Sequence, residues 1–269
     1  MFRFATCPGL FRVLASDMSD NNNPPSGNGI GRRPFLIASL ASLGAVAAGV
    51  HWLQRGPQGG DGPATAEAID LEHYQPGAFD QHEWRFLLAA CERLIPGDAA
   101  GPGALDTNVP VFIDRQMLTP YGKGEDWYMA APHDPQASKL FGYQMPFNLH
   151  ALYRKGIALT DRYTATAYGK AFADLPADRQ DAVLGGLEKN TIDFAAFGEP
   201  DLNAGYFFAR LLENTKEGYL ADPRYGGNKG MAAWVMINFP GARASFSDWI
   251  SKHDVVYPLK PVALDGTQA

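Results

Sequence analysis

The stretch GYLADPRYGGNKGMAAWVMINFPGA, residues 218–242, decides how the rest of the sequence is interpreted. Its five glycines and two prolines predict that no long helix or strand runs through it, because glycine is costly to order and proline lacks an amide donor. Tyr219, Tyr225, Trp234 and Phe239 nevertheless supply more aromatic area than a solvated loop needs. Amphipathic aromatics on such a backbone are typical of binding surfaces. We call residues 218–242 the central stretch and predict a partner interface there.

The predicted interface consists of nine residues of the central stretch: Tyr219, Asp222, Tyr225, Gly226, Gly227, Asn228, Trp234, Phe239 and Pro240. The alternative is a loop packed on its own domain. The nearly continuous apolar run at residues 231–237 keeps that alternative open, since such a run also suits a core element.

Hydrophobic periodicity upstream predicts a mainly α fold, because no segment shows the alternation of a half-buried strand. We expect a single irregular helical domain over residues 78–240, with long loops rich in Gly, Pro and aromatic residues, and an extended C-terminal arm over residues 241–269. The expected helices are residues 81–95 after an Asp80 N-cap, a helix capped by Thr107 or Asn108 with Pro110 in its first turn, residues 149–168, residues 177–189, and residues 204–217 after an Asn203 N-cap.

Residues 119–145 show neither helical nor alternating periodicity, and they contain Pro, Gly and five aromatic residues. Compact domains usually keep so long an irregular connection only for function. We therefore expect a second interface segment here.

The N-terminal region has the pattern of a twin-arginine export signal. Arg32 and Arg33 precede Phe35 and Leu36, which open an apolar run that is shorter than the roughly 20 residues needed to span a bilayer. We assign residues 1–50 to this signal and residues 51–77 to a flexible linker, and we expect export to the periplasm through the twin-arginine translocase. An uncleaved signal anchor is the alternative, and the cleavage site and the start codon, Met1 or Met18, stay open.

Composition excludes several classes of function. After residue 47 the chain holds 27 acidic and 19 basic residues, so no nucleic-acid partner is expected. The six histidines never stand at i, i+3 or i, i+4 from one another, and no haem-attachment, Cys-x-x-Cys, P-loop, Gly-x-Ser-x-Gly or strand-borne dinucleotide motif occurs. We therefore predict no catalytic, cofactor-binding or metal-binding residue in this chain.

Two weaker candidates remain. Cys91 lies on an apolar helical stripe and is expected to be a buried small hydrophobe, with a disulfide to a partner subunit as the alternative. Glu217 and Asp222 could form an acid and base pair, but exposed charges beside a glycine-rich turn are far commoner.

Three blocks, residues 87–117, 142–161 and 220–242, resemble the gluconate 2-dehydrogenase subunit 3 family over about residues 86–248. The resemblance implies a non-catalytic small subunit of a membrane-associated dehydrogenase complex for sugars or polyols, without fixing the substrate. In such complexes a large subunit carries FAD, a multihaem cytochrome c subunit passes electrons to quinone, and the small subunit carries the export signal and supports maturation of the flavoprotein. The alternatives are a free-standing periplasmic enzyme with a pocket lined by the central stretch, and a signal-anchored structural protein.

Overall fold

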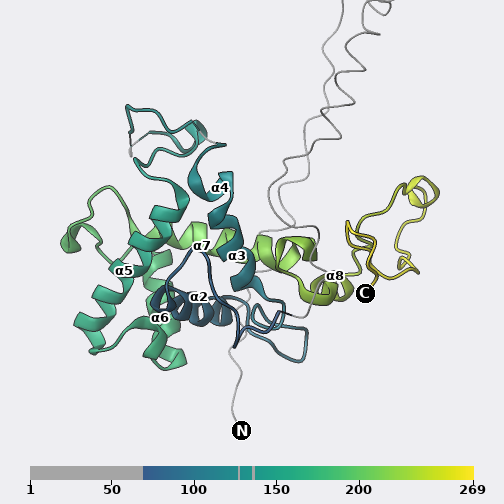
Figure 1. Ribbon diagram of the computed structural model, residues 1–269, viewed down its shortest axis with the longest axis horizontal. Coiled ribbons are helices and arrows are strands. Elements are labelled where there is room, and N and C mark those ends of the chain that lie inside the picture. Colours follow the sequence, from purple (N-terminus) through teal and green to yellow (C-terminus); the bar gives the residue numbers. More distant parts are fainter. Residues whose placement is uncertain (1–68, 127, 135–136) are drawn as a thin grey trace, which may run out of the picture. The chain divides into compact units, whose positions relative to one another are not determined.

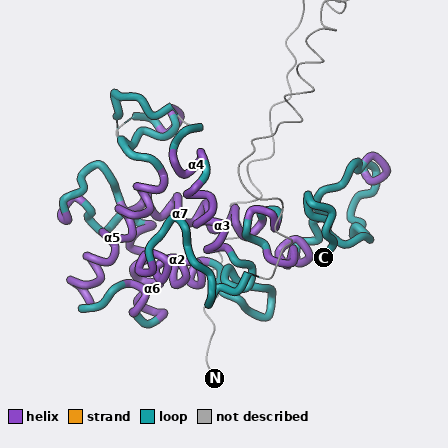
Figure 2. Tube along the Cα trace, viewed as in Figure 1, coloured by secondary structure: helices purple, strands orange, loops and turns teal. Residues whose placement is uncertain are grey.

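The computed structural model describes residues 69–126, 128–134 and 137–269 (Figure 1). Its regular structure is helical throughout, and no strand occurs in these ranges (Figure 2). The predicted mainly α fold is therefore confirmed. The predicted export signal, with Arg32, Arg33, Phe35 and Leu36, lies outside the described residues, as does most of the predicted linker.

The α-helices of the described part occur in the order α2 (Gln81–Leu94), α3 (Val109–Leu118), α4 (Pro120–Lys123), α5 (Leu149–Tyr168), α6 (Ala177–Glu188), α7 (Ala204–Leu220) and α8 (Ala232–Met236). Short 3-10 helices fall between and after them: η1 (Lys139–Phe141), η2 (Phe172–Asp174), η3 (Ala195–Phe197), η4 (Pro223–Tyr225), η5 (Lys229–Met231) and η6 (Ser247–Trp249).

Local capping chemistry starts most of the long helices where the sequence predicts. The Asp80 carboxylate accepts hydrogen bonds from the amides of His82 and Glu83, and the Glu83 carboxylate accepts one from the Asp80 amide in return. This reciprocal arrangement satisfies amide donors that the first turn of α2 would otherwise leave unpaired.

The capping prediction for α3 is wrong in its chemistry, although Asn108 is the N-cap residue. Asn108 has a left-handed backbone (φ 58°) and makes no side-chain cap hydrogen bond. The side-chain amide of Asn108 instead donates to the Ile69 carbonyl oxygen at 3.0 Å. The Thr107 hydroxyl donates to the Gly103 carbonyl oxygen at 2.9 Å. Asn108 therefore ties α3 to the chain that precedes α2.

The main core forms where α7 packs against α3, α5 and α6. Phe207 of α7 is fully buried, and a Cβ atom on Gly156 of α5 would lie 2.3 Å from its ring. The glycine that interrupts the apolar pattern of α5 is therefore the place where α7 approaches it. The buried Tyr153 hydroxyl donates to the Asn214 side chain at 2.9 Å across the same pair of helices.

Buried Asp114 of α3 ties the chain before α2 to the domain. Its carboxylate accepts hydrogen bonds from the Tyr74 hydroxyl at 2.8 Å and from the amides of Gly77 and Ala78, both at 2.9 Å. The packed part of the chain therefore includes residues before 78.

Candidate partner interface

The central stretch begins inside α7, which continues to Leu220 rather than ending at Glu217 as predicted. Gly218 lies against Phe112 of α3, and a Cβ atom there would come within 2.8 Å of that ring. After Leu220 the chain forms only η4, η5 and the five-residue α8. The expected absence of a long helix or strand holds from residue 221 to residue 242.

Asn228 joins the two ends of this region. Its side chain is fully buried, donates to the Ala221 carbonyl oxygen at 2.9 Å and accepts from the Ala233 amide at 3.0 Å. The next amide, that of Lys229, donates to the Thr107 carbonyl oxygen at 3.1 Å. These contacts fix α8 against the end of α7 and the start of α3.

Trp234 lies inward on α8 and is 6% exposed. Its indole N–H donates to the Leu220 carbonyl oxygen at 2.8 Å, which satisfies an acceptor at the end of α7. The ring packs with Met231 and with Ala263 and Ala269 of the C-terminal arm. Trp234 is therefore an element of a small second core.

The remaining inward residues hold the loop between α7 and α8 in place. The Asp222 carboxylate accepts from the amides of Arg224 at 3.1 Å and Leu264 at 2.7 Å, so it binds the arm as well as its own turn. A Cβ atom on Gly227 would lie 2.1 Å from the Gly218 carbonyl oxygen, and Gly226 has a left-handed backbone (φ 102°). The Tyr219 hydroxyl donates to the Pro102 carbonyl oxygen at 2.6 Å.

The structure thus separates the nine predicted interface residues into three groups by exposure. Six are buried, namely Tyr219, Asp222, Gly226, Gly227, Asn228 and Trp234, and Pro240 is half-buried. Tyr225 and Phe239 are exposed. The interface stays a prediction, and its surface-accessible members are these two aromatics.

Sequence reasoning missed the apolar side chains that surround Phe239. Five residues at the ends of α7 and α8, which we call the apolar edge, are each 43–54% exposed: Leu220, Val235, Met236, Ile237 and Phe239. Leu220 and Phe239 both lie beside Trp234, because the Phe239 and Trp234 ring centroids are 5.0 Å apart and the Trp234 indole N–H donates to the Leu220 carbonyl oxygen. Val235, Met236 and Ile237 follow Trp234 directly along the chain. The apolar run at 231–237 signalled the edge, but so short a helix does not show from sequence which side faces outward.

Residues 119–145, the second predicted interface segment, also present apolar side chains to solvent. Tyr128, Leu140 and Phe141 are more exposed than any member of the apolar edge. Its N-terminal end belongs to the domain, since α4 packs against α3 and α5. The segment is described without residues 127, 135 and 136, and its role as an interface stays a prediction.

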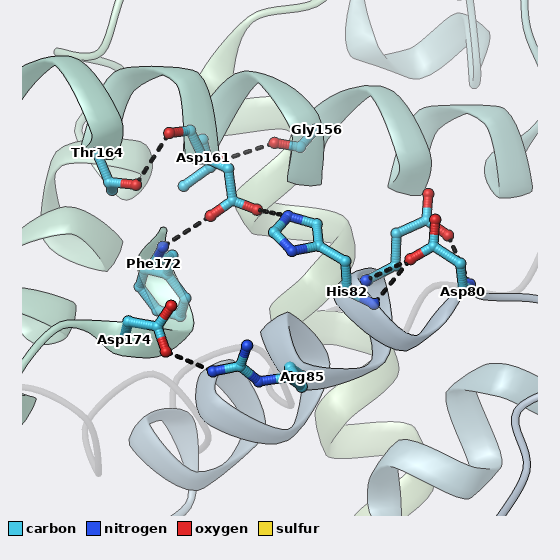
Figure 3. A network of polar contacts seen from close by, with 10 residues as sticks. Asp80, His82, Arg85, Gly156, Asp161, Thr164, Phe172 and Asp174 are labelled. Carbon is cyan, nitrogen blue, oxygen red and sulfur yellow. Dashed lines mark hydrogen bonds and ion pairs between the residues drawn. The ribbon is translucent and has the colours of Figure 1, made fainter. Parts of the chain in front are cut away.

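A histidine and carboxylate network lies between α2, α5 and η2 (Figure 3). His82 Nε2 lies 2.8 Å from one oxygen of Asp161, and the other oxygen accepts from the Phe172 amide at 2.7 Å. Arg85 forms an ion pair with Asp174 beside it. Because both Asp161 oxygens join separate elements to α5, we assign this network a structural role.

The weaker candidates are held in structural contacts. Cys91 is a free thiol with no exposed surface, and burial raises its pKa to about 12. Its sulfur is 3.8 Å from the Thr215 hydroxyl, so it occupies the core as predicted and a partner subunit cannot reach it in this conformation.

Glu217 and Asp222 bind different partners. The Glu217 carboxylate accepts from the side-chain amide of Asn214, whereas the Asp222 carboxylate accepts from the backbone amides of Arg224 and Leu264. In the described ranges, no group of three or more His, Cys, Asp or Glu side chains is placed to hold a metal ion.

An open hollow lies beside the loop that follows α2, and its lining residue Pro102 accepts the hydrogen bond from Tyr219 of the central stretch. Its lining includes Glu92, Asp98, Pro102 and Asp106, and no residue of 218–242 contributes. The helices of the described part include none with the length and apolar character needed to cross a bilayer.

The described part of the chain is a helical domain whose leading site candidate is an exposed apolar surface. The family model for gluconate 2-dehydrogenase subunit 3 matches residues 81–241, from the first residue of α2 to the end of α8 and five residues beyond it. This match covers more than half of the chain, so the chain belongs to that family, and its resemblance to the family is confirmed. It is a subunit 3-type protein of a multi-subunit gluconate dehydrogenase. No curated protein and no solved structure matches the chain significantly.

Proposed function

We propose that the chain is the non-catalytic small subunit of a periplasmic, membrane-associated dehydrogenase for sugars or polyols. A separate large subunit would hold FAD and oxidise the substrate, and a multihaem cytochrome c subunit would carry the electrons away. The small subunit would supply the twin-arginine export signal and support maturation of the flavoprotein. Family membership supports the general assignment, and the apolar edge is the observation that carries the docking role.

The apolar edge suits a docking surface because it combines exposure with a rigid base. Its side chains are accessible, while Trp234 and Asn228 of the same stretch are buried and hydrogen-bonded. Apolar side chains clustered on a preorganised base lose little conformational freedom on binding. We place the flavoprotein on the apolar edge together with Tyr225, and we keep residues 119–145 as a second contact.

The export role is tested by replacing both Arg32 and Arg33 with Lys. Lysine keeps the charge but not the planar guanidinium with its fixed pattern of donors. We expect fractionation to find both the variant chain and the co-expressed flavoprotein in the cytoplasm. Flavoprotein in the periplasm of cells carrying the double variant would rule out shared export.

The non-catalytic role is tested on the purified chain alone. We expect no flavin or haem absorbance and no dye-linked sugar oxidation until the flavoprotein is added. A stoichiometric chromophore, or turnover by the isolated chain, would favour the free-standing enzyme.

A further inference from the structure

The C-terminal arm is held at both ends by the central stretch. The Ala242 amide donates to the Val262 carbonyl oxygen at 2.7 Å, and the Leu264 amide donates to the Asp222 carboxylate at 2.7 Å. The arm leaves the domain after α8 and then returns, so that its last residue, Ala269, packs against the cluster that contains Trp234 of α8 (Figure 1). We call residues 243–260, between these two attachments, the arm loop.

The arm loop exposes large apolar side chains. Ile250 and Val256 are 77% and 74% exposed, and Phe246, Val255 and Leu259 are exposed as well. Exposed apolar side chains that occur singly are ordinary, but a concentration of them in one segment marks a contact surface.

Aromatic contacts bring the two sides of the arm loop together. The Tyr257 ring lies 4.9 Å from the Trp249 ring and 6.1 Å from the Phe246 ring, measured between centroids. Ile250 and Val256 are chain neighbours of this aromatic cluster. The Lys252 ammonium lies 4.1 Å from the centre of the Trp249 ring, and the Arg243 guanidinium lies 5.7 Å from that of Tyr257. Trp and Tyr beside Lys and Arg are the side chains that favour the interface between membrane and water.

The charge of the arm loop differs from that of the body. Residues 69–241 hold 22 acidic and 15 basic residues. The arm loop holds three basic residues, Arg243, Lys252 and Lys260, against two acidic ones, Asp248 and Asp254. An anionic bilayer would repel the body and attract the loop, which orients the chain with the loop toward the lipid.

The size of the arm loop also favours lipid over protein. A stable protein interface typically draws on about 20 to 30 residues of each partner, more than the 18 residues that the arm loop supplies without a second contact segment. Shallow contact with a bilayer needs only a few apolar side chains together with electrostatic attraction. Because the arm loop has no regular structure beyond η6, its backbone amides need water or headgroups, so only side chains can enter the apolar layer.

We propose that the arm loop is a peripheral contact with an anionic lipid surface. The apolar side chains would lie between headgroups, with Trp249 and Tyr257 at the interface and the basic residues on lipid phosphates. This goes beyond the proposed function, because it needs neither flavoprotein nor cytochrome. The loop also lies outside the segment matched by the family model, which ends at residue 241.

The test places an environment-sensitive fluorophore on the full chain at Ile250→Cys, in a Cys7→Ser background. Cys91 has no exposed surface, so the label goes to position 250. We expect a blue shift with brighter emission on vesicles of equal parts phosphatidylcholine and phosphatidylglycerol, and a weaker response on phosphatidylcholine alone. The readout is local, so the apolar run near the N-terminus does not contribute to it. Replacing Lys252 and Lys260 with Gln should weaken binding to the anionic vesicles by about thirtyfold.

The matched control carries the same label at Leu140→Cys, an apolar position that is 95% exposed in another segment. We expect no shift there. No shift at position 250, or equal shifts at both positions, would overturn the proposal. A shift at position 250 in the complex with the flavoprotein, before any lipid is added, would assign the loop to the protein partner instead. Co-purification with the flavoprotein is scored separately, so the two proposals can fail independently.

Discussion

Residues that face inward and residues that face solvent alternate along the 25 residues of the central stretch. The two sets have different neighbours. Asn228 and Trp234 face inward and carry hydrogen bonds that hold α8 to α7. Val235 and Ile237, one and three residues after Trp234, face solvent. A conspicuous aromatic residue in a glycine-rich stretch therefore does not identify a contact surface by itself, since the inward residues stabilise the base that presents the outward ones.

Trp234→Ala gives the largest expected effect on folding. The change empties a buried site and removes the hydrogen bond to the Leu220 carbonyl, so it should lower the free energy of unfolding by about 3 to 5 kcal/mol. Chemical denaturation of the free subunit measures this. Phe239→Ala is the control, because it removes an exposed aromatic that contacts the same ring; a similar loss in both variants would remove the distinction between inner and outer sides.

Replacing Asn228 should lower the free energy of unfolding by a smaller amount. Two variants separate the contribution of its side-chain hydrogen bonds from that of its left-handed backbone. Asn228→Gly keeps the left-handed backbone (φ 44°) accessible but deletes both side-chain hydrogen bonds, and should cost about 2 kcal/mol. Asn228→Ala should cost about 1 kcal/mol more, because alanine resists that backbone conformation. Equal stability of Asn228→Gly and wild type would show that the buried amide does not hold α8 in place.

Tyr225→Ala should change folding stability least, by less than about 0.5 kcal/mol, because the side chain is exposed in the free subunit. Thermal unfolding measures this. If Tyr225 contributes to docking as proposed, the same variant should still bind the flavoprotein less tightly. A large fall in melting temperature would place Tyr225 with the inner residues.

Patterns of short range predicted the helical part of the fold well. The bounds of α5 agree with the expected residues 149–168, and Asn203 caps α7 by accepting from the Tyr206 amide. These features depend on neighbours within one or two turns, where periodicity and capping rules apply. The extension of α7 to Leu220 was missed because glycine disfavours a helix interior, whereas Gly218 here leaves space for the Phe112 ring of α3, which is distant in sequence.

The candidate site was less predictable, because its burial depends on contacts distant in sequence. Asp222 binds the amide of Leu264, and Trp234 packs with Ala263 and Ala269 of the arm. No local pattern links these residues. The sequence located the region and its aromatic character, whereas the side that each residue faces required the three-dimensional arrangement.

The most direct test of the docking account is the affinity of the purified flavoprotein for the double variant Val235→Ser/Ile237→Ser. Both positions are about half exposed, so melting of the free subunit should be nearly unchanged. We predict a dissociation constant at least about thirtyfold higher than that of wild type, equivalent to about 2 kcal/mol for residues near the centre of an interface. Leu140→Ser, outside the apolar edge, should weaken binding less. An unchanged affinity for the double variant would contradict the claim that the flavoprotein docks on the apolar edge.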